Sequence, residues 1–248
     1  MQVSNNIYTN YNQIANTTKP QKTEESTFAS MLNSSENIKE EESGLFLKFM
    51  DQYNAFDSLS EKDRKHFKEI LKDDKITMAE MDSLSYEQAE KFEYYAYPPS
   101  TLPTHELNKA PIVMKPNQVS TMLFATRTTN DRAFNEALYK TAREINNDDH
   151  RSTLFSEVQT NLSQVHFGFE VLSSFNAGAK QKDLWNEDVQ IMNINFDNFL
   201  NDVISLHEKA LSNPKTHPAV IKQHEERLDG YNIILKHFNN IKSEPKYV

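Results

Sequence analysis

The histidines are the side chains of this sequence best suited to metal chemistry, because a neutral imidazole is the commonest protein ligand for transition metals. A di-iron helical bundle needs Glu-x-x-His on two helices, and a zinc protease needs His-Glu-x-x-His. The nearest approach to the first pattern is single, Asp63 followed by His66, and the second only begins, at His207-Glu208 and His224-Glu225. The eight histidines are spread through the chain: His66, His105, His150, His166, His207, His217, His224 and His237. The sequence therefore predicts no metal site.

Two histidines lie on or beside apolar stripes of predicted helices. His224 falls on a stripe and His166 flanks another. A histidine in such a position is usually partly buried and hydrogen-bonded to a carbonyl or carboxylate, which is the interpretation we favour. A metal-dependent helical-bundle enzyme built around His166 or His224 is the second alternative.

Nucleophilic catalysis finds no support in the sequence. There is no cysteine, and neither a Gly-x-Ser-x-Gly elbow nor a recognisable Ser-His-Asp context is present. Only 4 glycines occur, against a usual share of about 7%, although phosphate loops and dinucleotide folds need glycine where the backbone approaches a ligand. We expect a protein that is not an enzyme, with no catalytic residues and no cofactor.

The charge and hydropathy of the chain limit its partners and its location. A formal net charge of −9 argues against binding nucleic acid through its phosphates. No apolar run of about 18 residues occurs, which predicts no membrane insertion. The first residues lack the basic stretch and apolar core of a cleaved signal peptide. We expect a cytoplasmic protein, or one secreted without a cleaved signal peptide.

Three apolar stripes at steps of three and four residues dominate the second half of the chain. This spacing places each set on one face of an α-helix, so the fold class is predicted to be all-α, with an antiparallel helical bundle over 117–243. The same stripes would also allow a homo-oligomer through coiled-coil packing. The stripes are Phe155, Val158, Leu162, Val165, Phe169 and Leu172; Val189, Met192, Phe196, Phe199, Val203, Leu206 and Ala210; and Ile221, His224, Leu228, Tyr231, Leu235 and Phe238.

Two residues mark the last predicted helix. Pro218 suits its first turn, where the missing N–H costs nothing. Gly230 falls inside the helix and costs about 1 kcal/mol against alanine, which a close helix crossing at that point would explain.

A small helical subdomain is predicted over 44–97, followed by a linker over 98–116. Helices are expected over 45–56, 61–72, 78–83 and 86–96, the last two starting at capping boxes (Thr77 with Glu80, Ser85 with Gln88). The loop before Thr77 resembles half of a calcium EF-hand, but Leu71 replaces a ligand and Asp74 the turn glycine, so we expect no calcium binding. Five of the nine prolines fall in 98–116, which predicts an extended segment and a domain boundary, pinned by Val113 and Met114.

Residues 1–43 are predicted to form a disordered arm, because their polar composition cannot build a core. They contain scattered apolar side chains that a protein partner could bind: Tyr8, Tyr11, Ile14, Phe28, Met31 and Leu32. An ordinary disordered terminus is one interpretation. The other is an uncleaved export signal, since the first 25 residues are similar in composition to the signals of flagellar and other type III secretion substrates.

Aromatic residues immediately before Pro98 give a second candidate for partner binding. Tyr94, Tyr95 and Tyr97 follow Phe92 too closely for all of them to face one core. The sequence as a whole predicts a non-enzymatic, acidic bacterial protein that acts through a protein partner, as a substrate or factor of a flagellar or type III-like export system. The first alternative is a cytosolic adaptor or chaperone-like bundle.

Overall fold

The computed structural model describes residues 43–166, 168, 170–172 and 194–244. They all lie in one of the two compact units into which the chain divides, Glu42–Val248. The protein is all-α, as predicted: the described residues form helices joined by turns, with a single parallel β-bridge between Lys75 and Met114 and no strand.

The four short helices expected in the first half are present. They are α2 (Leu45–Gln52), α3 (Glu61–Ile70), α4 (Met78–Asp82) and α5 (Tyr86–Tyr95). Both capping boxes form as predicted. The Thr77 side chain accepts a hydrogen bond from the N–H of Glu80, whose carboxylate accepts one from the N–H of Thr77. These reciprocal bonds satisfy N–H groups that the first turn leaves without helical partners.

Asp74 joins the α3–α4 loop to the start of α2. Its carboxylate accepts hydrogen bonds from the backbone N–H groups of Leu45 and Phe46, each at 2.8 Å. Its own backbone has φ of +60°, a conformation that most side chains disfavour and Asp tolerates. The residue that replaces the EF-hand glycine therefore caps a helix 28 residues earlier in the chain.

The proline-rich segment 98–116 is only partly extended. Helix α6 (Thr104–Leu107) interrupts it, so the prediction of an extended segment was wrong over those residues. Val113 is buried as expected, while the Met114 side chain is exposed and its backbone pairs with Asp74 and Ile76. The prolines flank α6 rather than enter it, which leaves its short turn intact. The division of the chain at 98–116 stays a prediction.

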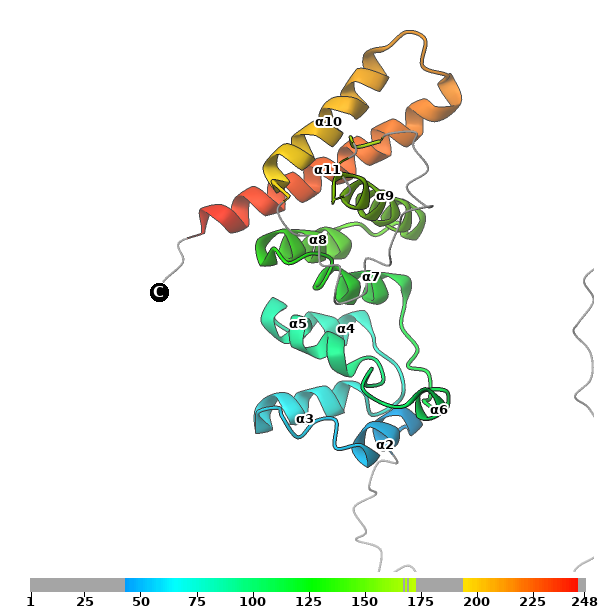
Figure 1. Cartoon of the computed structure of the whole chain (residues 1–248), viewed down its shortest axis with the longest axis vertical. Coiled ribbons are helices and arrows are strands. Elements are labelled where there is room, and N and C mark those ends of the chain that lie inside the picture. Colours follow the sequence, from blue (N-terminus) through cyan, green and yellow to red (C-terminus); the bar gives the residue numbers. More distant parts are fainter. Residues whose placement is uncertain (1–42, 167, 169, 173–193, 245–248) are drawn as a thin grey trace, which may run out of the picture. The chain divides into compact units, whose positions relative to one another are not determined.

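The second half contains the long helices. They are α7 (Asn117–Ala125), α8 (Arg132–Glu144), α9 (Asp148–His166), α10 (Phe196–Ser212) and α11 (Pro218–Ser243). Helix α11 packs along α8, α9 and α10, and α10 and α11 form an antiparallel hairpin (Figure 1). Pro218 is the first residue of α11, as the sequence predicted.

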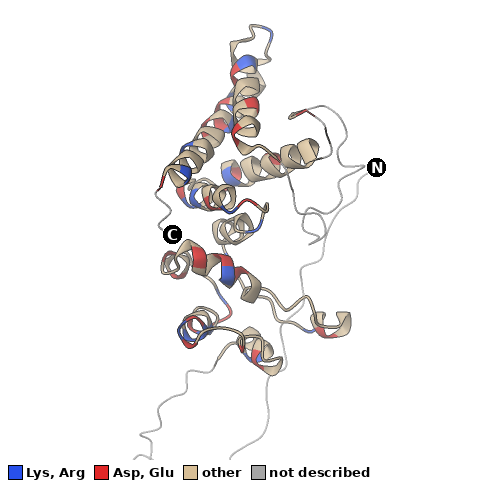
Figure 2. Cartoon of the chain, turned by 60° about the vertical axis from the view of Figure 1, so that its left-hand side comes forward, with Lys and Arg blue, Asp and Glu red and all other residues tan. Residues whose placement is uncertain are grey.

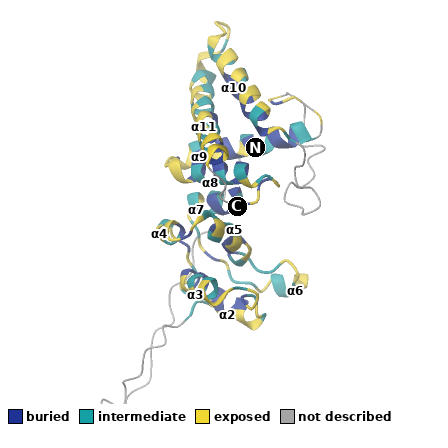
Figure 3. Cartoon of the chain, turned by 90° about the vertical axis from the view of Figure 1, so that its left-hand side faces the viewer, coloured by how far each residue is buried: buried dark blue, intermediate teal, exposed yellow. Residues whose placement is uncertain are grey.

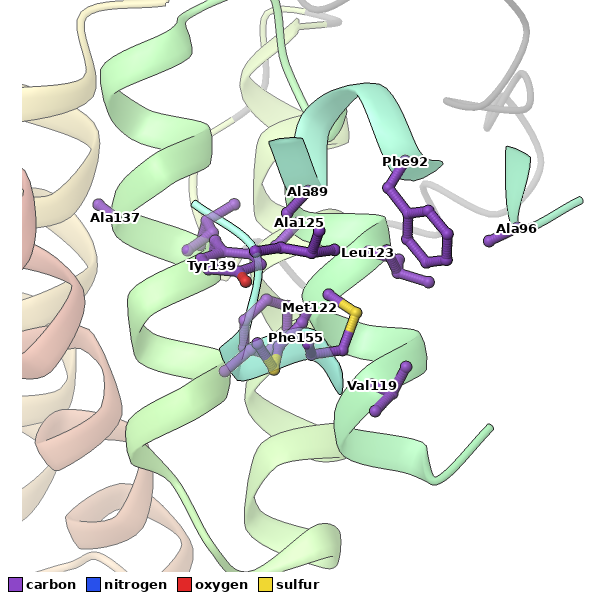
Figure 4. Packing of buried hydrophobic residues seen from close by; sticks show 14 of the residues in the cluster. Ala89, Phe92, Ala96, Val119, Met122, Leu123, Ala125, Ala137, Tyr139 and Phe155 are labelled. Carbon is purple, nitrogen blue, oxygen red and sulfur yellow. The ribbon is translucent and has the colours of Figure 1, made fainter. Parts of the chain in front are cut away.

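One hydrophobic core links the two halves. Phe92 and Ala89 of α5 lie beside Leu123 and Met122 of α7, and buried Tyr139 comes from α8 (Figure 4). Buried residues gather where α7, α8 and α9 meet, whereas the tip of the α10–α11 hairpin is exposed (Figure 3).

Phenylalanines anchor the base of α10. Phe134 of α8 stacks on Phe196 with ring centroids 4.2 Å apart and meets Phe199 and Phe238 edge-on. Such aromatic pairs contribute beyond their buried area. The first turn of α10 is therefore held between α8 and α11.

Several helix boundaries differ from the predicted ones. Helix α2 ends at Gln52, whereas a helix over 45–56 was predicted. Helix α9 ends at His166, although its predicted apolar stripe continued to Leu172, and Leu172 lies in a turn with φ of +52°. Helix α10 begins at Phe196, where Asn195 caps it. Phe169, Val189 and Met192 lie outside the described residues. The apolar period thus continued past the residue at which the helix stops, because spacing alone carries no stop signal.

Candidate functional site

The three tyrosines before Pro98 point to different surroundings, as their close spacing required. Tyr94 is 69% exposed. Tyr95 is half-buried, stacked on Phe56 with centroids 5.4 Å apart and tilted against Phe67. Tyr97 is half-buried on the side of α7. The structure does not bring the three rings together into one patch.

A small hollow adjoins Tyr94 on the outer side of α5. It has a volume of about 180 Å³, and its lining is mostly apolar. We call this surface, with Tyr94 on its edge, the Tyr94 hollow; its lining residues are Leu59, Glu90, Lys91, Tyr94 and Tyr95. An exposed aromatic ring beside an apolar depression is typical of a protein contact surface.

Tyr97 belongs to a different environment, a group of charged residues at the end of α5. The Lys115 amino group lies 4.1 Å from the Tyr97 ring centroid and donates a hydrogen bond to the carbonyl of Ala96. Burial lowers the pKa of Lys115. Burial also raises the pKa of Glu93, whose carboxylate lies 2.9 Å from Nε of Arg127. These contacts hold the chain where it leaves α5, and whether Tyr97 also binds a partner stays a prediction.

The remaining predicted partner-binding residues lie outside the described residues. They are Tyr8, Tyr11, Ile14, Phe28, Met31 and Leu32. Their role stays a prediction.

A second candidate is a polar cluster between α9, α10 and α11, centred on His207. The His207 side chain is 2% exposed. Its Nε2 lies 3.0 Å from Oε1 of Glu157, and its Nδ1 lies 3.0 Å from Nδ1 of His224. Arg227 donates from Nε to the other oxygen of Glu157 at 3.1 Å. Four side chains from three helices are therefore joined in one chain of contacts.

Tyr231 and Asn161 close the cluster toward the core. The Asn161 amide donates to the Tyr231 hydroxyl at 3.0 Å. Burial raises the pKa of Tyr231 well above its ordinary value, and the charge of Glu157 acts in the same direction. Tyr231 therefore remains a neutral phenol at neutral pH.

The predicted stripe on α10 missed His207. It placed Leu206 on the seam, but Leu206 is only half-buried, while Val203, Ile204 and His207 are buried. A step of four residues from Val203 leads to His207 and is as compatible with a helix as the step of three that leads to Leu206. The prediction took Leu206 because it is apolar and His207 is polar. His224 occupies the seam as predicted, and its partner is His207.

Metal binding has little geometric support in this cluster. Among the residues that the structure describes, no three His, Cys, Asp or Glu side chains gather in a group that could hold a metal ion. His166 is the last residue of α9. The metal-dependent alternative stays a prediction.

The described helices include none that is long and apolar enough to cross a membrane. No protein-family model, no curated protein and no solved structure matches this chain.

Proposed function

We propose that the protein acts without catalysis, by binding another polypeptide at the Tyr94 hollow. The single observation that carries this proposal is the Tyr94 ring, 69% exposed on a regular helix beside an apolar depression. Exposed aromatic side chains are enriched among the residues that dominate binding energy at protein interfaces. A ring held by a helix also loses little freedom on binding.

The size of the hollow favours a protein partner over a small molecule. Ligand pockets usually enclose about 300–1,000 Å³, and the Tyr94 hollow offers about 180 Å³. That space suits one apolar side chain of a partner. We accordingly expect the partner to present an apolar or aromatic side chain from a helix or loop. Polar groups beside that side chain would interact with Glu90 and Lys91.

Larger depressions elsewhere are less suited to ligands. A cleft of about 500 Å³ between α9 and α11 is lined by polar and charged side chains, including Asp149, Lys222 and Glu226. An open groove of about 430 Å³ beside α7 is lined by Tyr97, Phe124 and Phe155 together with hydroxyl and amide side chains, and it would leave a bound molecule largely exposed to solvent. Small-molecule sites are instead mostly apolar and enclosed, with few polar groups.

The distribution of charge also supports a protein partner. Lys and Arg residues alternate with Asp and Glu residues on the same helices (Figure 2). On α3 and α5, for example, Lys68 pairs with Asp51 and Lys91 with Asp63. Nucleic-acid binding proteins instead concentrate positive charge on one face.

Site-specific photo-crosslinking tests the proposal. A photoreactive phenylalanine analogue is placed at Tyr94 in cells that produce the protein, and at Leu45, which is 66% exposed, as the matched control. We expect a discrete adduct from position 94 that position 45 does not give. The same adducts from both positions, or none from position 94, would contradict the proposal. An adduct of twice the chain mass would make the partner a second copy and contradict a different polypeptide.

A stability control accompanies this experiment. Tyr94→Ala should change the free energy of unfolding by less than about 0.5 kcal/mol, because exposed side chains contribute little. Tyr95→Ala should cost several times more, since Tyr95 packs on Phe56 and Phe67. An unlabelled wild-type chain should then compete the adduct away, whereas an unlabelled Tyr94→Ala chain should not, and this difference would report binding rather than unfolding.

As a finer proposal, we infer that the partner belongs to a flagellar or type III-like export system, with this protein as its substrate or factor. Its support is the composition of the first 25 residues, which is rich in Asn, Thr, Gln and Ser and has no acidic residue before Glu24. Deletion of residues 2–25 should abolish the extracellular protein of a secreting strain. A variant with the same residues in shuffled order should retain export, because the signal is compositional. Equal extracellular amounts with and without residues 2–25 would contradict export.

A further inference from the structure

The contacts of His207 determine where its protons lie. Arg227 is always charged and donates to Glu157, so Glu157 meets it as a carboxylate. A carboxylate only accepts hydrogen bonds, and Nε2 of His207 must therefore carry the proton shared with Glu157. When His207 is neutral, its Nδ1 is an acceptor, and Nδ1 of His224 is the donor to it across 3.0 Å.

One extra proton leaves this arrangement intact. It can reside on Nε2 of His224, which does not face His207, while the Nδ1–H of His224 continues to donate. It can equally reside on His207, which then donates from Nδ1 to a neutral His224. In both cases a single proton lies between the two Nδ1 atoms, so the contact stays a hydrogen bond.

A second extra proton is incompatible with the same contact. Both imidazoles would then carry N–H on Nδ1, and two donors would face each other at 3.0 Å with two positive charges behind them. In the described part of the chain, His207 contacts two titratable side chains besides His224, which are Glu157 of α9 and Tyr231 of α11. Arg227 of α11 contacts Glu157. Arg227 already balances Glu157, and Tyr231 stays neutral, so these groups do not compensate a doubly charged pair.

We propose that His207 and His224 form a pH-sensitive latch, which holds α10 against α9 and α11 while at most one imidazole is charged and releases α10 when both are. Histidine is the side chain whose charge ordinarily changes between about pH 5 and 8. Two charged imidazoles fit the opened chain, whereas the contact between the two Nδ1 atoms has room for one proton. Because the opened state binds more protons, acid favours opening and the latch weakens as the pH falls.

The release should be local. The base of α10 is held by Phe196 and Phe199 against Phe134, contacts that do not titrate. Beyond His207 the helix leads to the exposed tip of the hairpin (Figure 3). Opening is therefore expected over the distal half of α10, from Val203 to Ser212, while the base stays in place. This device is independent of the Tyr94 hollow, which lies on α5.

Hydrogen exchange of the full chain, read by peptide mass and corrected for intrinsic exchange at each pH, tests the latch. Because opening takes up one proton, protection of the distal half of α10 should fall by up to about tenfold for each pH unit of acidification. Peptides covering α3 serve as the internal reference. We expect the distal half of α10 to lose protection relative to α3 between pH 7.5 and pH 5.0, and residues 196–202 to lose much less.

His224→Gln is the decisive variant, because His224 is half-buried and its replacement leaves His207 on Glu157. Without a second imidazole, the preferential loss at acid pH should disappear. His105→Gln removes an exposed histidine of α6 and should keep the loss. If the wild-type chain shows no preferential loss on α10, or if His224→Gln loses protection as the wild type does, the latch does not exist.

Discussion

A methyl group on Gly230 of α11 would lie 2.6 Å from Cδ2 of Leu154 on α9. Carbon atoms pack at about 3.5–4.0 Å, so this distance is a severe overlap. Leu154 is completely buried, so it can yield only by disturbing its packed neighbours. The sequence predicted a close helix crossing at Gly230, and the structure confirms it: α9 and α11 approach as closely as a residue without a side chain permits.

Gly230→Ala should therefore destabilise the protein although alanine is the better helix former. Overpacking of a core costs about 1–3 kcal/mol, while the helix propensity of alanine returns about 1 kcal/mol. We expect a net loss of about 1 kcal/mol in the free energy of unfolding, measured with urea. A gain in stability would show that Leu154 gives way without cost.

Leu154→Ala provides the matching partner for a double-mutant cycle. Alone it should cost about 2–5 kcal/mol, as removal of a buried leucine does. The space it opens lies against residue 230, so the double variant should be less destabilised than the sum of the two single changes by at least about 1 kcal/mol. Additivity would mean that the two side chains do not meet.

Asp74 combines two functions that substitutions can separate. Asp74→Ala removes the cap on α2, worth about 0.5–2 kcal/mol, and forces alanine into a positive φ, which costs about 1–2 kcal/mol. Asp74→Gly removes the cap, but glycine adopts the positive φ without strain. Asp74→Asn retains an oxygen acceptor for the cap, and asparagine also tolerates the positive φ. The expected order of stability in urea unfolding is wild type, Asn, Gly, Ala. If Asn is as destabilising as Ala, the carboxylate charge rather than the geometry holds α2.

Replacement by phenylalanine should have opposite effects at two buried tyrosines, Tyr139 and Tyr231. The Tyr139 hydroxyl is buried and has no hydrogen-bond partner among the described residues, and the Tyr231 hydroxyl accepts from Asn161. Tyr139→Phe removes an unsatisfied polar group and should leave stability unchanged or raise it by about 1 kcal/mol. Tyr231→Phe leaves the Asn161 amide without that acceptor in the core and should cost about 1–3 kcal/mol. Thermal or urea unfolding of the two variants at pH 7 decides, and equal losses would contradict the assignment of partners.

The features that the sequence predicted correctly are those set by neighbours within a few residues. The capping box at Thr77 and Glu80 and the first-turn position of Pro218 depend on local backbone groups, which any helix start supplies. Gly230 was informative because a glycine inside a helix needs a tertiary reason.

The features that the sequence could not predict depend on contacts between distant segments. Asp74 caps a helix 28 residues away, and no local pattern identifies such a pair. Helical spacing from Val203 allows either Leu206 or His207 to face the core, and the sequence favours the apolar residue. His207 is the buried one because Glu157 on α9 offers it a polar partner there. The sequence also could not tell which of Tyr94, Tyr95 and Tyr97 is exposed, because that depends on the packing of Tyr95 against Phe56 and Phe67.

Alkaline pH offers a test of the α5–α8 contact. Burial raises the pKa of Tyr139 to about 12, and burial also raises the pKa of Tyr86, whose ring meets it edge-on at 5.5 Å. An ordinary tyrosine titrates near pH 10. Above that pH the unfolded chain therefore releases protons that the folded chain still holds. Since the folded state then binds more protons, the free energy of unfolding falls as the pH rises.

Tyr139→Phe should reduce this alkaline loss. The stabilising contribution of Tyr139 is complete below pH 10 and disappears as the pH rises toward 12, so the wild type should lose about 1 kcal/mol more than the variant between pH 10 and pH 11. Urea unfolding at pH 9, 10 and 11 measures the difference. Tyr94→Phe, at an exposed position, should follow the wild type. Parallel losses in wild type and Tyr139→Phe would mean that the Tyr139 hydroxyl reaches solvent, and that the contact between α5 and α8 is looser than its buried rings indicate.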